Sequence, residues 1–251
     1  MIKKNKYLIS NLTNKNPTKD ISEEDLKYKL VKSTSQKKIT VKINNKVSFG
    51  PKFLPIIAGP NGIESKELLF EVAKYFKKIG VNIFRVHAFK PLTFPYRSKQ
   101  YYDVGNNGLK WVNELKKYYN FTYVSEITEI QYLEDMCNTV DILQIGSRNM
   151  QNFELLRECA KSKKPIILKR HFGTSLRDFL GAAEHILLEG NNKLILCERG
   201  VAAPHTHKDT SRFMLDLQAI VALKEISCLP IISDPSHASF WAPWVPHLAF
   251  A

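Results

Sequence analysis

Short apolar runs alternate with amphipathic segments through most of the chain after residue 54. Seven runs have the length and composition of buried strands, and six segments carry apolar residues at helical spacing. The expected strands are 55–58, 82–86, 122–126, 142–145, 165–169, 193–197 and 230–233, and the expected helices lie near 64–79, 107–119, 128–137, 152–162, 175–189 and 211–226. Strands that alternate with helices pair in parallel through right-handed crossovers, so the predicted fold class is α/β.

The segment before these repeats alternates apolar and polar residues on both sides of Asn44 and Asn45. This pattern over 38–49 predicts a β-hairpin with a two-residue turn. A hairpin able to close the bottom of a ring of strands favours a TIM-type (β/α)8 barrel over an open doubly wound sheet. The active site of such a barrel lies at the carboxyl ends of its strands.

The end of the chain is short for a complete barrel. Residues 238–251 are too few for an eighth strand and its helix, and an open barrel leaves two strand edges without partners. We expect the barrel to be cut before its eighth strand, within an apolar helix at 247–251; the alternative is a partner or an exchanged segment that completes it. The expected domains are a polar N-terminal arm at 1–36, with a short helix near 23–32, and an incomplete catalytic barrel domain at 37–251.

Composition restricts the class of function. The 251 residues are 44% apolar, enough for the core of one domain. The net charge of +13 favours anionic ligands, but the lysines and arginines are dispersed, which argues against nucleic acid. The four cysteines show no metal-site spacing, and no run is apolar enough for a signal peptide or a membrane span. We therefore expect a cytoplasmic protein with reduced thiols that binds neither nucleic acid nor membrane.

Cations recur where the expected strands end, namely at Arg85, Lys90, Arg148, Lys169 and Arg199. Parallel strands lying side by side would bring them to one edge of the sheet. Guanidinium groups bind phosphate or carboxylate through two hydrogen bonds, and lysine adds a compact charge that can donate a proton. The sequence predicts a site for a small molecule that carries a phosphate and a carboxylate.

Asp234 and His237 follow the last expected strand. They can act as a general acid and base or bind a divalent ion, and a loop-capping Asp beside an exposed His is the structural alternative. Glu126, at the end of its own strand, can orient a cation or the substrate, or form a structural pair with a lysine. We count Asp234 and His237 as candidate catalytic residues and Glu126 as a candidate substrate-binding residue.

Six ordered motifs carry a resemblance to a known family. They are AGPNGIES at 58–65, RVHAFKPLTFPY at 85–96, QIGSRNMQNF at 144–153, LKR at 168–170, ILCERG at 195–200 and SDPSH at 233–237. Together they resemble the class I 3-deoxy-D-arabino-heptulosonate 7-phosphate (DAHP) synthases, in the branch shared with the 3-deoxy-octulosonate 8-phosphate (KDO8P) synthases. The resemblance extends from about residue 38 to residue 251.

The resemblance implies an aldol-like condensation of phosphoenolpyruvate with erythrose 4-phosphate that releases phosphate, the first step of the shikimate pathway to aromatic amino acids. It assigns the following residues to the phosphate and carboxylate of phosphoenolpyruvate: Arg85, Arg148, Lys169 and Arg199. Lys90 would lie between the substrates as the proton donor, and Thr93 would face the phosphosugar. His237 would lie near the reacting centre, and a homo-oligomer is common in the family.

The chain departs from the family pattern at Asn61, at Leu92 and at the pair Val86 and His87. Asn61 replaces a cysteine that binds the catalytic metal in many members, but the metal-independent octulosonate synthases also have Asn there. We therefore expect catalysis without metal or other cofactor, with Asn61 among the catalytic residues. Leu92 replaces an arginine that binds the sugar phosphate. Val86 and His87 stand where the family has two small residues, which crowds the floor of the site or adds a donor.

The substitution at Leu92 leaves the acceptor open. One alternative is a KDO8P-synthase-like enzyme that uses another phosphosugar or aldehyde. A second alternative is a catalytically inactive relative that serves as a binding or regulatory subunit.

Overall fold

The main sheet of the computed structural model contains seven parallel strands, paired in the order in which they occur along the chain. The structure describes residues 28–32, 37–90, 104–203, 213–239 and 241–251. The strands are β3 (Ile57–Ala58), β4 (Ile83–Arg85), β5 (Thr122–Ile127), β6 (Ile142–Ile145), β7 (Ile166–Lys169), β8 (Leu194–Glu198) and β9 (Ile231–Ser233). This order is that of a barrel wall and not of a doubly wound sheet, so the predicted barrel architecture is confirmed.

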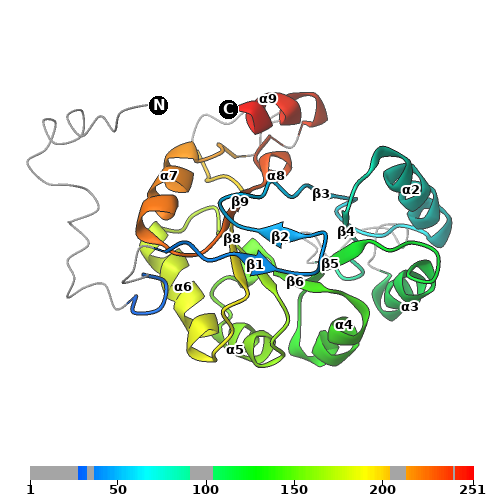
Figure 1. Cartoon of the computed structure of the whole chain (residues 1–251), viewed down its shortest axis with the longest axis horizontal. Coiled ribbons are helices and arrows are strands. Elements are labelled where there is room, and N and C mark those ends of the chain that lie inside the picture. Colours follow the sequence, from blue (N-terminus) through cyan, green and yellow to red (C-terminus); the bar gives the residue numbers. More distant parts are fainter. Residues whose placement is uncertain (1–27, 33–36, 91–103, 204–212, 240) are drawn as a thin grey trace, which may run out of the picture.

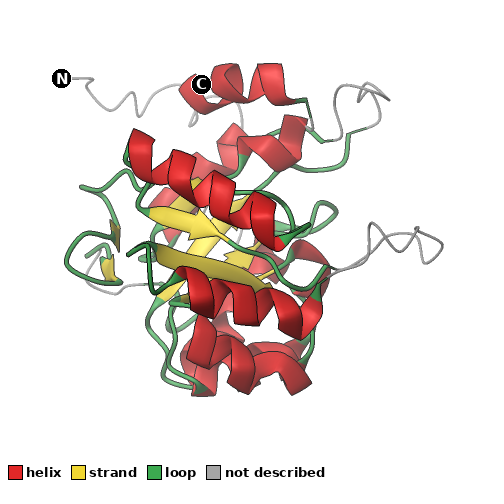
Figure 2. Ribbon diagram, turned by 90° about the vertical axis from the view of Figure 1, so that its right-hand side faces the viewer, coloured by secondary structure: helices red, strands yellow, loops and turns green. Residues whose placement is uncertain are grey.

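Helices cover the outer side of the curled sheet (Figure 1). They are α2 (Lys66–Ile79), α3 (Gly105–Leu115), α4 (Leu133–Thr139), α5 (Phe153–Lys161), α6 (Leu176–Leu188) and α7 (Leu217–Ile226). Shorter elements are the 3₁₀ turns η2 (Ile130–Tyr132), η3 (Ser147–Asn149) and η4 (Ala242–Trp244), with α8 (Pro235–Ser239) and α9 (Val245–Phe250) at the end. A view from the side shows the strands enclosed by the helices (Figure 2).

Side-chain caps fix where several of these helices begin. Ser65, Asn152, Ser175 and Asp216 each accept a hydrogen bond from the backbone amide three residues further along. Such a bond satisfies one of the free amides of the first turn. The helix expected from residue 211 therefore begins only after its cap, at residue 217, so this boundary was wrong.

Two apolar layers lie on the two sides of the sheet. The layer beneath the helices is the larger and includes Phe84, Leu143 and Leu168. The inner layer contains one residue from each of several strands, together with Val41, Val47 and Phe49 of the hairpin. Alternate residues of a strand point to opposite sides, so each strand contributes to both layers.

The hairpin of β1 (Val41–Lys42) and β2 (Ser48–Phe49) lies across the centre of the strands in Figure 1. Lys42 pairs with Ser48, which leaves the five residues 43–47 between the strands and not the expected two. Asn44 explains the difference, because its side-chain Oδ1 accepts hydrogen bonds from the amides of Lys46 and Val47 at 2.8 and 3.0 Å. This side chain closes the turn in place of a tight backbone bend.

Residues 28–32 are attached to the outside of α6. The Tyr28 hydroxyl donates to the Arg177 carbonyl at 2.6 Å, and the Val31 amide donates to Glu184 Oε1 at 2.7 Å. These residues form a turn, so the described part of the expected helix at 23–32 is not helical. None of the helices in the described part of the chain is long and apolar enough to cross a membrane.

The contribution of the hairpin to stability can be measured at Phe49. Its side chain is 1% exposed, whereas Phe53 just after the hairpin is 50% exposed. We expect Phe49→Ala to lower the free energy of unfolding by about 3 to 5 kcal/mol, through lost burial and the cavity left behind. Phe53→Ala serves as the matched control, with a change of less than about 1 kcal/mol. Urea unfolding measures both, and equal effects would contradict the assigned role.

Candidate active site

The inner side of the sheet turns from apolar to polar toward the carboxyl ends of the strands. Ile83, Val124, Ile142, Ile167 and Ile195 lie in the layer above the hairpin. Two residues further along four of these strands, on the same side, are the polar residues Arg85, Glu126, Gln144 and Lys169. On β8 the corresponding residue is Cys197, which still belongs to the apolar layer. The period of two therefore places the polar residues at one mouth, as the sequence predicts.

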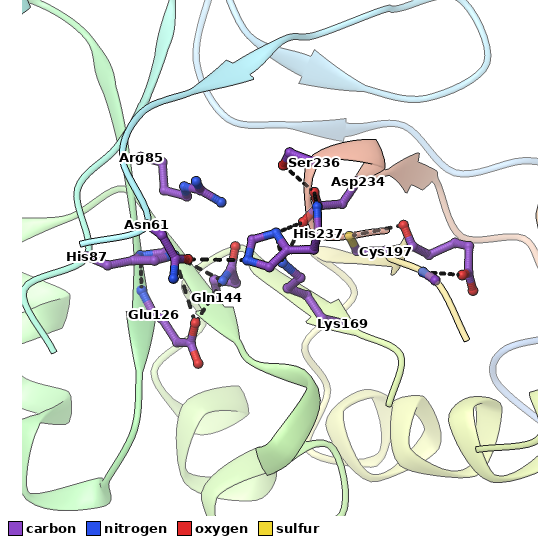
Figure 3. A network of polar contacts seen from close by, with 12 residues as sticks. Asn61, Arg85, His87, Glu126, Gln144, Lys169, Cys197, Asp234, Ser236 and His237 are labelled. Atoms are coloured by element: carbon purple, nitrogen blue, oxygen red, sulfur yellow. Dashed lines mark hydrogen bonds and ion pairs between the residues drawn. The ribbon is translucent and has the colours of Figure 1, made fainter. Parts of the chain in front are cut away.

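Lys169 lies at the centre of this mouth (Figure 3). Its ammonium group is 2.6 Å from Asp234 Oδ2 and 3.4 Å from His237 Nδ1. His237 Nδ1 is in turn 2.7 Å from Asp234 Oδ2, and its Nε2 is 3.2 Å from Asn61 Oδ1. Four candidate residues from three separate motifs thus form one connected group.

The charges of this group are mutually dependent. Burial would raise the pKa of Asp234, but the Lys169 charge and the hydrogen bond from His237 outweigh it and hold that pKa well below its usual range. Burial lowers the pKa of His237, although its bond to Asp234 partly opposes this effect. The group therefore contains an ionised Asp234, with a His237 ring that favours the neutral form.

Arg85 attaches the loop of the first motif to the sheet. Its Nε and NH2 groups donate to the carbonyls of Pro60 and Gly59 at 3.1 and 2.8 Å. Gly59 has φ +143°, and a Cβ there would lie 2.3 Å from the Arg85 carbonyl oxygen. Only glycine accepts both the backbone conformation and this close approach, and the result is that Asn61 is held over the mouth.

Lys90 lies against the same loop. A Cβ on Gly62 would be 1.6 Å from Lys90 Cε, so the lysine side chain passes directly over this glycine. Lys90 is thus close in space to Asn61, as expected for residues of one site. Thr93, the expected contact for the phosphosugar, lies outside the described residues, and so does Leu92.

His87, Glu126 and Gln144 form the floor on the side of β5 and β6. The Glu126 amide donates to His87 Nδ1 at 2.8 Å. Gln144 Nε2 lies 3.1 Å from His87 Nε2 and 3.2 Å from Glu126 Oε2. Burial raises the pKa of Glu126, an effect that Lys169 and the Gln144 hydrogen bond reduce, and burial together with Arg85 holds the pKa of His87 well below its ordinary value.

The two remaining candidate arginines differ in exposure. Arg199 is 3% exposed, and its guanidinium carbon lies 4.2 Å from the centre of the Phe213 ring. A planar cation stacked on an aromatic face in this way is fixed in orientation. Arg148 belongs to η3 and is exposed, and its charge acts on Glu126 and His171.

Arg170 does not face the mouth, although it follows Lys169 directly. Its NH1 donates to Glu198 Oε2 and to Asp216 Oδ2, both at 2.9 Å, and its Nε donates to the Thr174 carbonyl at 3.1 Å. Glu198 also accepts from the Gly200 amide at 2.7 Å. This buried group ties the end of β8, and with it Arg199, to the segment that begins α7.

The sequence motifs contain the cations of the mouth but do not indicate which polar side chains contact them. Gln144 and Asp216 were not singled out, because nothing in their local sequence shows which strand or loop they meet. His87 was recognised as a departure that adds a donor, but its Nδ1 accepts a hydrogen bond from Glu126. The useful signal was positional, since His87 and Gln144 continue the inward-facing positions of their strands.

The side chains at the mouth bear on whether a metal ion could be held there. The described residues contain no group of three His, Cys, Asp or Glu side chains that could hold a metal ion. At the position of the family's cysteine, the Asn61 amide oxygen lies next to His237 Nε2.

Comparisons with known proteins agree with the motifs. The model of the DAHP synthetase I family matches residues 38–241. A phospho-2-dehydro-3-deoxyheptonate aldolase from Thermotoga maritima is 38% identical over 211 residues, which are 84% of this chain and 61% of that protein. A 2-dehydro-3-deoxyphosphooctonate aldolase from Acinetobacter baylyi is 26% identical over 196 residues, 73% of this chain and 64% of that protein. The chain thus spans less than two thirds of the length of these relatives.

Solved structures show the same likeness. The crystal structure of a DAHP synthase from Thermotoga maritima aligns with a TM-score of 0.77 and 34% identity, covering 85% of this chain and 60% of that one. A truncated form of the 3-deoxy-D-arabino-heptulosonate 7-phosphate synthase from that organism aligns with a TM-score of 0.78 and 34% identity, covering 88% of this chain and 78% of that one.

The buried ion pair of Arg170 and Glu198 is expected to contribute to stability. Glu198 is fully buried, whereas Glu158 forms an exposed pair with Lys161 on α5. We expect Glu198→Gln to lower the free energy of unfolding by about 3 kcal/mol or more, because Arg170 loses a buried counter-charge. Glu158→Gln is the matched control, with a change of less than about 0.5 kcal/mol. Urea unfolding compares them, and similar losses would refute the assignment.

Asp234 adds a dependence on pH. The folded-state pKa of Asp234 lies well below the ordinary value of a carboxyl. Its contribution to the free energy of unfolding is therefore present above about pH 4 and is lost as pH falls through the folded-state pKa. We expect Asp234→Asn to cost about 3 kcal/mol at neutral pH. The difference from the unmutated protein should shrink below about pH 4 in urea unfolding. A difference independent of pH would contradict the ionised state of Asp234.

Proposed function

The chain belongs to the DAHP synthetase I family, and on this premise we propose that it condenses phosphoenolpyruvate with erythrose 4-phosphate and releases inorganic phosphate. The observation that carries the proposal is the grouping of Lys169, Asp234, His237 and Asn61 at one mouth of the sheet. A site of this kind, with cations at several neighbouring strand ends, suits a substrate that carries both a phosphate and a carboxylate.

In the proposed arrangement, cations around the mouth bind phosphoenolpyruvate. Arg199, held flat by Phe213, suits a planar carboxylate or a phosphate, and Arg148 is the exposed cation at the entrance. Lys169 supplies a buried charge at the end of β7, with Arg85 at the end of β4. Since these groups are ordered before substrate arrives, they stabilise charge without reorganising.

The proposed reaction joins two carbon atoms. The C3 carbon of phosphoenolpyruvate attacks the aldehyde carbon, and water adds to C2, from which inorganic phosphate leaves. Lys90, beside the loop of Asn61, donates a proton to the oxygen of the former aldehyde. Asp234 and His237 hold Lys169 in place, so that its charge lies beside C2 and its oxygens.

We propose that this reaction needs no metal. The support is the side-chain set itself, because His237 uses Nδ1 for Asp234 and its Nε2 faces the Asn61 amide. An amide oxygen is a poorer ligand than thiolate for the borderline ions that cysteine binds. A neutral ring that donates from Nδ1 to Asp234 has an acceptor at Nε2. Asn61 therefore holds the imidazole by a hydrogen bond when its amide nitrogen is turned toward Nε2.

A second candidate acceptor is favoured by one observation. Asn61, followed by Glu64 and Ser65, is the arrangement that also resembles metal-independent octulosonate synthases, and Leu92 removes the usual cation for the phosphate of the four-carbon sugar. The alternative reaction uses arabinose 5-phosphate with the same phosphoenolpyruvate chemistry. In either case we propose a homo-oligomer in the cytoplasm, with residues 37–251 carrying the site.

The acceptor and the metal requirement can be measured together. Phosphate release from phosphoenolpyruvate would be followed with each sugar, with and without a chelator, on the longest natural protein that contains this chain. We expect chelator-resistant turnover with erythrose 4-phosphate. Turnover with arabinose 5-phosphate alone would select the second candidate, and chelator-sensitive turnover would refute metal independence. Binding of phosphoenolpyruvate without turnover would indicate the inactive relative.

Lys169→Met tests the central cation. We expect it to reduce kcat/KM by about 10²-fold or more, because a preorganised buried charge is lost from the reacting centre. Lys161→Met, on the outer surface of α5, is the matched control and should leave kcat/KM within about twofold of the unmutated protein. Circular dichroism checks that both variants fold, and equal activities would contradict the assignment.

A further inference from the structure

The floor of the site contains three polar side chains whose proton positions follow from their contacts. His87 is 1% exposed and Gln144 is 5% exposed, so water contributes little to their hydrogen bonding. His87 lies just beyond β4, Gln144 in β6, and Glu126 in β5 between them (Figure 3). Buried polar groups of this kind are expected to satisfy one another.

The backbone determines the state of the imidazole. The Glu126 amide N–H is always a donor, and it lies 2.8 Å from His87 Nδ1. That nitrogen must therefore be the acceptor, because a protonated Nδ1 would set two donors against each other. His87 is then neutral and carries its proton on Nε2.

The position of Gln144 follows next. Its terminal atom, placed as Nε2, lies 3.1 Å from His87 Nε2 and 3.2 Å from Glu126 Oε2. An amide nitrogen there would set its own hydrogen against the proton of His87. Turning the amide by 180° exchanges nitrogen for oxygen without changing its shape, and the oxygen accepts the proton of His87. The oxygen then faces Glu126, and this contact is favourable only if Glu126 is the donor.

We infer that His87 and Gln144 hold Glu126 as a neutral carboxylic acid, which donates its proton to Gln144 Oε1. The chain of donors is complete in this state, from the Glu126 amide to His87 Nδ1, from His87 Nε2 to Gln144 and from the Glu126 carboxyl to the same oxygen. With an ionised Glu126, either the Gln144 nitrogen meets the donor Nε2 of His87, or the Gln144 oxygen meets a second acceptor on Glu126. His87 and Gln144 are positioning residues in this arrangement.

The surroundings of Glu126 both raise and lower the pKa of its carboxyl group. Burial raises its pKa most strongly, and the charges of Lys169, Arg85 and Arg148 lower it. A hydrogen bond from the Gln144 nitrogen also lowers this pKa, but only while that nitrogen faces Glu126, and the net direction is upward. Asp234 and His237 also face His87 across the mouth. Since Asp234 already neutralises Lys169 at 2.6 Å, the cation nearest the floor has a counter-ion of its own.

A neutral Glu126 changes the charge that the site presents. Asp234 is then the ionised carboxylate at the mouth, and the positive charge of Arg85 and Arg148 stays available for an anionic ligand. The inference concerns the protein without substrate, and it holds or fails independently of the proposed condensation.

Carbon-13 NMR of the full chain, labelled at the glutamate carboxyl carbons, tests the inference. A pH titration reports the ionisation of each carboxyl, and the signal missing in Glu126→Gln is that of Glu126. We expect it to remain in the acid form to a higher pH than the signals of surface glutamates. Ionisation together with the surface glutamates would overturn the inference.

His87→Phe tests the positioning role, with His185→Phe as the matched control, because His185 stacks on Phe153 in the helical layer. Without the proton of His87, Gln144 can turn its N–H toward Glu126 and stabilise the carboxylate. The Glu126 signal should then titrate at lower pH in His87→Phe and be unchanged in the control. An unchanged or raised midpoint in His87→Phe would refute the role of His87. If that variant does not fold, the titration of the Glu126 signal in the unmutated protein decides whether the carboxyl is held in its acid form.

Discussion

The pair of Lys169 and Asp234 depends on the curvature of the sheet. Lys169 ends β7 and Asp234 follows β9, with β8 between them. Neighbouring strands are about 4.8 Å apart, so in a flat sheet these positions would be separated by about 10 Å. Inward-pointing side chains of a curled sheet converge, and the charged atoms meet at 2.6 Å. The hairpin packs against the inner side of the curled sheet, and a bottom layer of apolar residues thus underlies the polar mouth.

The same alternation separates two kinds of charged group. Residues on the inner face, such as Arg85 and Lys169, meet at the mouth, whereas Arg170 and Glu198 lie on the outer face and bond to each other. The outer pair fixes the connection that carries Arg199. Buried charges on both faces have partners, which is the condition for retaining them in the interior. The inner face is left for ligand binding, because the ion pair on the outer face fixes the connection that carries Arg199.

The architecture could be predicted because it rests on local periodicity. The expected strand at 142–145 has the observed bounds, and the other expected strands differ by one or two residues at either end. Features that depend on a single side-chain contact were predicted less well. The Asn44 side chain lengthens the hairpin turn, and the Asp216 cap delays α7. The partners of Arg170 come from two distant segments, and no local sequence pattern predicts them.

The departures from the family pattern indicate where this chain is distinct. Asn61 meets His237 on one side of the mouth, and His87 meets Gln144 and the Glu126 amide on the other. Neither substitution removes a cation, and both add a group that can hydrogen bond in either sense. The cations proposed to bind phosphoenolpyruvate are thus present, whereas the hydrogen-bonding groups around them differ from the family pattern. This change fits a site in which hydrogen bonds, and not a metal ion, orient His237 and the side chains of His87, Glu126 and Gln144.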